Sequence, residues 1–311
     1  MLAKFKACGG MPYDVFTHLY DVMVQSVIKY GAAIWGTQSY SRIKSVQMRA
    51  SRFFLGVGKY TPNAAVQGEM GWDFPQQRIG VCIARLWCRE VNLDDCRLNK
   101  RVFKWAKDQP PHLCTWFKRA RSIFSSIDVD FCNEVNIENV RSVISNVDAK
   151  LKTMYIEEWK NDLNKVEGIN GTGRNKLRTY RLFKADYEVE KYVKQNLTRK
   201  CRSAYAKFRC GVAPLRIETG RYIGLEESQR TCYFCENVVE NEVHVITQCN
   251  KYLDIRNNLY AEARNVVDGF DSLNDCDKFV VLFKNDNLCY HVAKASDMIL
   301  NQRLLFLSKN M

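Results

Sequence analysis

Three cysteines and one histidine near the C-terminal end have the spacing of a metal site, and this feature constrains the chain most. Two residues separate Cys232 from Cys235, eight separate Cys235 from His244, and four separate His244 from Cys249. Two thiolates on a tight turn, followed by a histidine and a cysteine at the start of a helical pattern, can supply four ligands to one Zn²⁺. Four protein ligands leave no open position, so the spacing predicts one structural zinc ion per chain.

Buried free cysteines are the alternative explanation, because the chain has 13 cysteines and free cysteine is common in protein cores. Two observations favour the metal. The chain has only 4 histidines, and one of them lies at the required spacing. The segment between the two pairs, ENVVENEV, is polar and acidic, which is typical of a loop. The remaining cysteines are scattered without a disulfide framework, which favours a reducing compartment.

The composition is that of a folded protein, with 46% hydrophobic and 12% aromatic residues over 311 positions. The first ten residues, MLAKFKACGG, lack the apolar run of a secretory signal. The longest apolar stretch, residues 22–35, is interrupted by Gln25 and Lys29 and is too short to span a bilayer. We therefore expect a soluble, intracellular protein with no membrane partner.

The net charge of +13 is concentrated in two blocks of the chain. Residues 1–110 carry 16 basic and 8 acidic side chains, and residues 171–230 carry 15 basic and 6 acidic ones. The segments after each block are slightly acidic, and the second block directly precedes the metal motif. Basic side chains grouped in this way favour a polyanionic partner.

Helical spacing of apolar residues dominates the chain, whereas strand-like alternation is scarce. The sequence therefore predicts a mostly α fold, a multi-helix array with a small CCHC zinc-binding module near the C-terminus. Two apolar stripes are expected to face inward: Phe16, Leu19, Met23, Val27, Tyr30 and Ile34, and then Ile43, Val46, Ala50, Phe53 and Val57. Further helices are expected after Thr61-Pro62, over 75–91, 98–107, 112–124 and 137–166, after Thr198, up to about 267, and over 271–283 and 287–309.

Composition and charge divide the chain into four expected segments, 1–60, 61–170, 171–231 and 232–311. The glycine-rich run at 168–173 is the clearest linker. In 171–231, basic residues alternate with aromatic ones, a combination that suits phosphates and unpaired bases. Solvation of the cations and burial of the aromatic rings is the alternative, and the spacing of Tyr205 and Phe208 favours burial. The candidate nucleic-acid-binding residues are Arg174, Lys176, Arg178, Arg181, Lys184, Arg199, Lys200, Arg202, Lys207, Arg209, Arg216, Arg221 and Arg230.

Several segments together resemble one family. They are KYGAAIWG (29–36), VQMRASRFFLGVGKYTPNAAVQGEMGW (46–72), NKLRTYRLFK (175–184), LRIETGRY (215–222) and RTCYFCENVVENEVHVITQC (230–249). The chain is similar to the C-terminal part of non-LTR (LINE-type) retrotransposon reverse transcriptases. The resemblance extends from about residue 10 to 256 and is loose between 95 and 170. It is most specific at the metal motif and the LRIETGR segment.

The resemblance implies thumb-like helices in 1–60, a helical connector in 61–170 and a C-terminal zinc finger formed by Cys232, Cys235, His244 and Cys249. It also implies RNA or DNA partners, the rest of a reverse transcriptase, and a location in nucleus and cytoplasm. Such proteins act in target-primed reverse transcription. Their catalytic aspartates should lie N-terminal to this segment and are absent. We therefore expect a truncated open reading frame that begins at an internal Met, with no catalytic residue and no polymerase activity of its own.

The one adjacent aspartate pair, Asp94-Asp95, lacks the apolar flanks of a polymerase turn and is expected to be solvated. No phosphate-binding loop is present, since GINGTG lacks the Gly-Lys-Ser/Thr ending. A second hypothesis is a zinc-stabilised helical adaptor for protein partners. A third is an enzyme whose palm is supplied separately.

Overall fold

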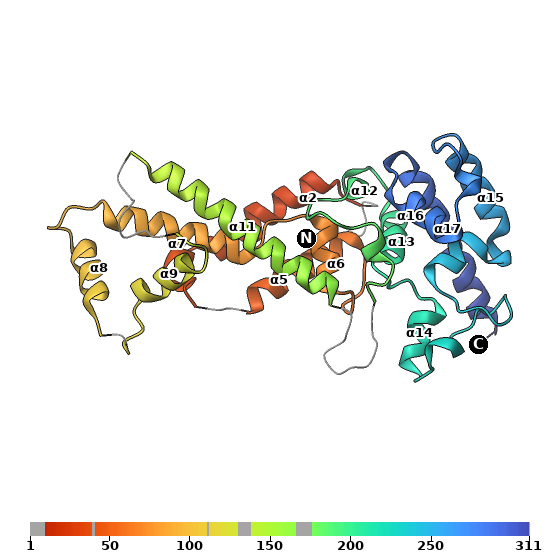
Figure 1. The fold of residues 1–311 in the computed structure, drawn as a ribbon, viewed down its shortest axis with the longest axis horizontal. Helices are drawn as coiled ribbons and strands as arrows, with labels where there is room; N and C mark the ends of the chain where they lie inside the picture. Colours follow the sequence, from red (N-terminus) through yellow and green to blue (C-terminus); the bar gives the residue numbers. More distant parts are fainter. Residues whose placement is uncertain (1–9, 39–40, 111, 130–137, 166–175, 311) are drawn as a thin grey trace. The chain divides into compact units, whose positions relative to one another are not determined.

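The computed structural model describes residues 10–38, 41–110, 112–129, 138–165 and 176–310. Helices dominate these ranges, which contain no strand beyond an isolated bridge between Thr231 and Val239, so the predicted mostly α fold is confirmed (Figure 1). The chain forms two compact units. Unit 1 comprises Met1–Phe16, Met48–Gly71 and Leu163–Met311, and unit 2 comprises Thr17–Gln47 and Trp72–Asp162.

The helical elements follow one another closely along the chain. Up to residue 165 they are α2 (Tyr13–Tyr20), η1 (Asp21–Gln25), α3 (Ser26–Lys29), α4 (Ala32–Trp35), α5 (Ser41–Leu55), α6 (Asn63–Met70), α7 (Pro75–Val91), α8 (Leu98–Asp108), α9 (Trp116–Ser125) and α11 (Val140–Asn164). From residue 176 they are η2 (Tyr180–Leu182), α12 (Lys191–Lys194), α13 (Arg199–Arg209), α14 (Arg216–Tyr222), η3 (Glu227–Gln229), η4 (His244–Gln248), η5 (Asn250–Tyr252), α15 (Leu253–Arg264), η6 (Phe270–Ser272), α16 (Asp275–Lys284), η7 (Asp286–Leu288) and α17 (Cys289–Asn310).

Unit 2 is built around α7, which has the bounds that the sequence predicted because proline at its first position suits a helix start. The ring of Trp87 lies 4.5 Å from that of Phe117 and 5.2 Å from that of Phe103, so α9 and α8 pack on α7. Gly36 lies so close to α7 that a Cβ there would be 2.2 Å from a methyl group of Ile79. Only glycine fits this close approach.

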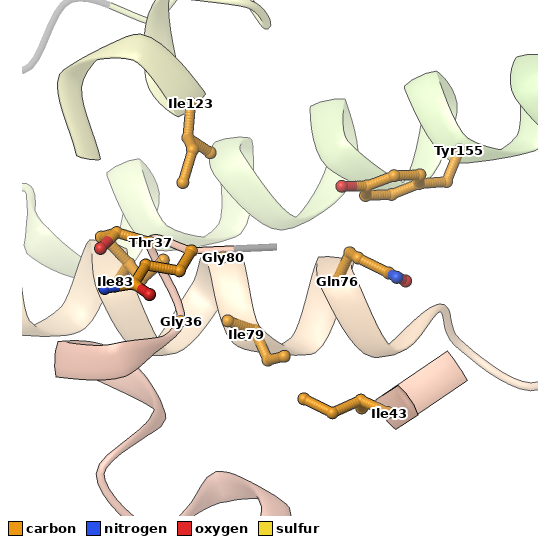
Figure 2. Close-up of a pocket in the computed structure, with 10 residues that line it drawn as sticks. Gly36, Thr37, Ile43, Gln76, Ile79, Gly80, Ile83, Ile123 and Tyr155 are labelled. Atoms are coloured by element: carbon orange, nitrogen blue, oxygen red, sulfur yellow. The ribbon is translucent and has the colours of Figure 1, made fainter. Parts of the chain in front are cut away.

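A cavity of about 240 Å³ lies within unit 2 (Figure 2). Its described lining is mixed. Apolar side chains come from Ile43, Ile79, Ile83 and Ile123, polar ones come from Thr37, Gln38 and Gln76, and the Tyr155 ring lies on one side. Burial raises the pKa of the Tyr155 hydroxyl to about 12. The described lining residues include no carboxylate, imidazole or amine.

Unit 1 is centred on the packing of α13 on α17. The Thr198 hydroxyl accepts a hydrogen bond of 3.3 Å from the Cys201 amide, which caps α13 at the predicted position. Tyr205 and Phe208 are buried, as their spacing predicted, and their rings lie 5.0 and 6.3 Å from that of Phe283. Because α13 and α17 share one unit, the two units differ from the four consecutive segments expected from the sequence.

The buried face of α5 differs from the predicted one. Val46 is exposed, whereas Gln47, Met48 and Phe54 are buried. The ring of Phe54 packs 4.9 Å from that of Phe16 in unit 1. Apolar residues occur on more than one side of α5, so their spacing predicted the helix correctly and its rotation incorrectly.

The first apolar stripe is only partly buried. Phe16 is buried, but Met23, Val27, Tyr30 and Ile34 are exposed. The expected continuous helix is interrupted by the π-helical turn η1 and again by Gly31, which has a left-handed φ of 64°. These interruptions rotate the later side chains away from the face that a continuous helix would present. Within the described ranges, no helix has the length and apolar character needed to cross a bilayer.

Candidate metal centre and basic residues

Two short segments of unit 1 place the candidate metal ligands. Cys232 and Cys235 lie on the turn that follows η3. The Cys232 amide donates a 2.8 Å hydrogen bond to the Val238 carbonyl, and this bond closes the loop from residue 232 to residue 238 that carries both cysteines. His244 begins the π-helical turn η4, and Cys249 follows its end. The Cys249 amide bonds the His244 carbonyl at 2.8 Å, so this turn holds the second pair of ligands together.

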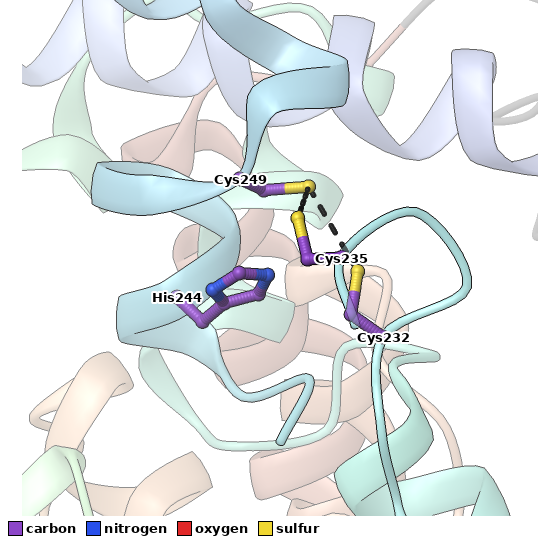
Figure 3. A group of neighbouring side chains, drawn as sticks. All are labelled: Cys232, Cys235, His244 and Cys249. Carbon is purple, nitrogen blue, oxygen red and sulfur yellow. Dashed lines mark hydrogen bonds between the residues drawn. The ribbon is translucent and has the colours of Figure 1, made fainter. Parts of the chain in front are cut away.

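The four side chains converge on one point (Figure 3). Their ligand atoms all lie within 4.8 Å of one another. The Cys249 sulfur is 3.9 Å from that of Cys232 and 3.8 Å from that of Cys235. A tetrahedron of sulfurs about 2.3 Å from a central ion has edges of about 3.8 Å, so these separations fit a metal ion. The predicted grouping of the four residues is therefore confirmed.

The histidine presents Nε2 to the cluster. This atom is buried and makes no hydrogen bond with the described residues. The other ring nitrogen, Nδ1, lies 3.2 Å from the Gln248 side-chain oxygen. The Gln248 amide nitrogen in turn donates to an Asp275 carboxylate oxygen at 2.9 Å. This chain of contacts favours the tautomer with its proton on Nδ1, which leaves the Nε2 lone pair for a metal ion.

The sulfurs of Cys232 and Cys249 share a proton at close range, an arrangement that a bound cation would replace. The contact with Cys249 is the main reason that the pKa of the Cys232 thiol is lowered to about 3. The same contact, with burial, raises the pKa of the Cys249 thiol. For His244, burial opposes the imidazolium, but the contacts with Cys232 and Gln248 outweigh it and raise the pKa. A bound cation would displace these protons, because metal ligands must be deprotonated.

Two of the three carboxylates in the acidic loop between the ligand pairs are shielded from solvent, whereas Glu236 is exposed. Glu240 and Glu242 are buried completely. The Glu240 carboxylate binds the Arg303 guanidinium of α17 and accepts a 2.7 Å hydrogen bond from the Arg216 amide at the start of α14. The Glu242 carboxylate accepts a 2.6 Å hydrogen bond from Arg178. The loop is therefore fixed to three other segments of unit 1.

The predicted nucleic-acid-binding residues fall into distinct environments. Arg174 lies outside the described residues. Lys184, Arg202 and Arg209 are buried. Arg209 binds Glu69 and Glu190, Lys184 binds Glu190, and Arg202 donates to the Phe54 carbonyl. These three side chains pair with groups inside unit 1 and are not accessible to a ligand in this structure, so their prediction as nucleic-acid-binding residues was wrong.

The remaining nine cations reach solvent, with Lys200 exposed and the others partly buried: Lys176, Arg178, Arg181, Arg199, Lys207, Arg216, Arg221 and Arg230. Arg181 donates to the carbonyls of Leu163 and Lys165, and Arg230 donates to those of Leu225 and Ile217. A carbonyl fixes a guanidinium without cancelling its charge. Arg181 and Arg230 are therefore held in place by neutral partners and keep their full positive charge.

Sequence patterns did not indicate several residues of this region. Glu69 comes from α6 and lies 140 positions from its partner Arg209. The sequence patterns also did not predict the short helix α14, although Arg216 and Arg221 on it were among the candidates. The pair Asp94-Asp95 is exposed, as expected, and Asp95 binds Lys104 at 2.7 Å.

Comparison with known proteins identifies no relative of this chain. No family model, no curated protein and no solved structure matches the chain.

Proposed function

We propose that unit 1 is a zinc-stabilised polynucleotide-binding unit, equivalent to the C-terminal part of a non-LTR retrotransposon reverse transcriptase. In this proposal the chain binds RNA or DNA and acts in target-primed reverse transcription only together with a polymerase palm. The resemblance of the metal motif and the LRIETGR segment to that family supports the assignment. Because the family's catalytic aspartates are absent, we expect no primer extension by this chain alone.

Zinc is the metal that suits the Cys232, Cys235, His244 and Cys249 donor set. Thiolate and imidazole ligands favour Zn²⁺ over the hard cations Mg²⁺ and Ca²⁺, which prefer oxygen. Four protein donors in a tetrahedral arrangement are typical of a structural zinc site. The ion would join the two ligand pairs and hold the loop that carries Glu240 and Glu242.

The observation that carries the proposal is the excess of accessible positive charge in unit 1. Of the nine cations that reach solvent, Lys176, Arg178 and Arg221 lie within 4 Å of a carboxylate, that of Glu218. Among the described residues, the other six form no salt bridge: Arg181, Arg199, Lys200, Lys207, Arg216 and Arg230. Such a surface attracts a polyanion and releases its counterions on binding.

The test is the salt dependence of binding to a short RNA and to the same sequence as single-stranded DNA. We expect log K to fall with log salt by about 0.7 to 0.9 for each phosphate contacted. The double variant Arg199→Glu/Lys200→Glu should weaken binding and flatten this slope. The control Arg101→Glu/Lys107→Glu makes the same change in net charge on exposed positions of α8. Undetectable or salt-insensitive binding by the wild type would contradict the proposal.

A second candidate, an adaptor for protein partners, is favoured by one observation in unit 2. Leu98, Val102 and Trp105 are exposed at helical spacing along α8. Such a stripe is typical of a helix that packs on a partner. The adaptor is favoured if the wild type binds no polynucleotide and the variant Val102→Glu abolishes capture of a protein partner.

A further inference from the structure

Three cations of unit 1 surround the single carboxylate of Glu218. The Lys176 amine lies 3.8 Å, the Arg178 guanidinium 3.1 Å and the Arg221 guanidinium 3.5 Å from its oxygens. Glu242 binds Arg178 from the other side, so three positive charges face two negative ones. The Glu218 side chain is almost fully buried, whereas those of Lys176 and Arg178 are 20% exposed. The cluster therefore presents a net positive charge to solvent.

An exposed tyrosine lies on one side of this cluster. The Lys176 amine that approaches Glu218 also donates a 3.3 Å hydrogen bond to the Tyr60 carbonyl, which fixes the loop between α5 and α6 beside the cluster. The Tyr60 residue is 65% exposed. The Lys59 amine lies 4.7 Å from the centre of the Tyr60 ring. An aromatic surface and a cation are thus offered to solvent together.

A second exposed tyrosine adjoins the cluster from α14. Arg221 reaches Glu218 one helical turn back along α14, and Tyr222 is the next residue and the last of the helix. Tyr222 is 71% exposed. Lys176, which binds the Tyr60 carbonyl, and Arg221, which precedes Tyr222, both contact Glu218, so the two exposed tyrosines adjoin the same charged cluster.

Alternation of exposed aromatic rings with cations matches the chemistry of an unpaired nucleic-acid strand. In such a strand the bases can stack on aromatic side chains while the phosphates bind lysine and arginine. A duplex hides its base faces and would use only the cations. An acidic peptide would likewise use the cations and leave both tyrosine rings without a matching group.

We propose that Tyr60 and Tyr222 are stacking positions for two bases of a single-stranded RNA or DNA whose phosphate backbone lies along Lys59, Lys176 and Arg221. This inference rests on the proposed polynucleotide-binding function and specifies its substrate as an unpaired strand. Neither tyrosine belongs to the metal centre or to the core of unit 1. Both can therefore be replaced without removing a buried contact.

The test compares binding of a ten-nucleotide RNA in single-stranded and duplex form, with 2-aminopurine in the single strand as a reporter of stacking. Tyr60→Leu and Tyr222→Leu should each weaken single-strand binding by about fivefold or more. Both should restore part of the 2-aminopurine fluorescence that stacking quenches. The salt slope should stay unchanged, since no phosphate contact is lost. Tyr60→Phe and Tyr222→Phe should bind like the wild type because the ring remains.

Tyr290→Leu is the matched control, since it removes an exposed tyrosine from α17 in the same unit. If the wild type binds single strands but the leucine variants bind equally well, the stacking inference fails and the polynucleotide function stands. Equal losses on duplex RNA would also contradict stacking. Competition by polyglutamate at the same charge concentration would identify a general polyanion surface instead. If the wild type binds neither RNA form, both proposals fail.

Discussion

The Glu240 carboxylate, in the loop between Cys235 and His244, binds the Arg303 guanidinium of α17, and both side chains are almost completely buried. The pair connects the metal loop to a helix that lies more than 60 positions further along the chain. Arg303 also donates a 2.9 Å hydrogen bond to the Pro214 carbonyl, just before α14. The loop, α14 and α17 are therefore held by one guanidinium.

Removal of this guanidinium should be costly. Arg303→Met leaves the Glu240 carboxylate buried without its cation, and we expect a loss of about 3–5 kcal/mol in the free energy of unfolding. The double variant Arg303→Met/Glu240→Gln removes both charges and should recover much of that loss. Urea unfolding of metal-loaded protein measures both. Arg264→Ala breaks a solvent-exposed pair with Asp271 and should leave the free energy of unfolding nearly unchanged. Equal effects of Arg303→Met and Arg264→Ala would contradict this prediction.

A glycine determines how closely two segments of unit 1 approach. Gly211 has a φ of 64°, and a Cβ there would lie 2.0 Å from the Lys176 carbonyl oxygen. We expect Gly211→Ala to lower the free energy of unfolding by more than about 1 kcal/mol, through strain and the clash together. Gly224→Ala isolates the strain, since that glycine has a φ of 73° but no atom within 4 Å. If thermal unfolding shows the same loss of stability for Gly211→Ala and Gly224→Ala, the clash with the Lys176 carbonyl contributes nothing and this prediction is wrong.

Glu190 should make stability depend on pH. Burial raises its pKa above 4.5, and the neighbouring Glu69 adds to this, although Arg209 opposes it. A raised pKa means that the folded state holds this proton more tightly than the unfolded state. The resulting stabilisation is complete below pH 4.5 and is lost as pH rises through the raised pKa.

The comparison with Glu190→Gln isolates this contribution. Relative to the variant, the wild type should lose stability as pH rises from 4.5 toward 7, measured by urea unfolding at several pH values. Glutamine does not titrate, so the variant lacks the contribution of Glu190 to the pH dependence of stability and keeps those of the other acidic groups. A stability difference that does not change with pH would show that Glu190 has the same pKa in both states.

Local patterns allowed much of this structure to be predicted from the sequence. The ligand spacing of Cys232, Cys235, His244 and Cys249 describes two short segments, and each folds through its own backbone hydrogen bonds. The start of α7 at Pro75 and the cap of α13 at Thr198 depend equally on neighbouring residues. Such features need no knowledge of the rest of the chain.

The roles of individual charges could not be predicted in the same way. Arg209 and Lys200 both belong to the basic helix α13, yet one binds Glu69 in the core and the other is exposed. The difference depends on a carboxylate from α6, which is distant in sequence. The rotation of α5 was mispredicted for the same reason, since Phe16 is among the contacts that select its buried face.

Metal analysis of the purified protein tests the central claim most directly. We predict one zinc ion per chain, and its loss from Cys235→Ser together with faster amide exchange over residues 232–249, because a structural zinc ion contributes folding energy. Cys276→Ser, at an exposed cysteine of α16, should keep the full zinc content. A wild-type protein without zinc, or a Cys235→Ser variant that retains the ion as well as the Cys276→Ser control, would contradict the account.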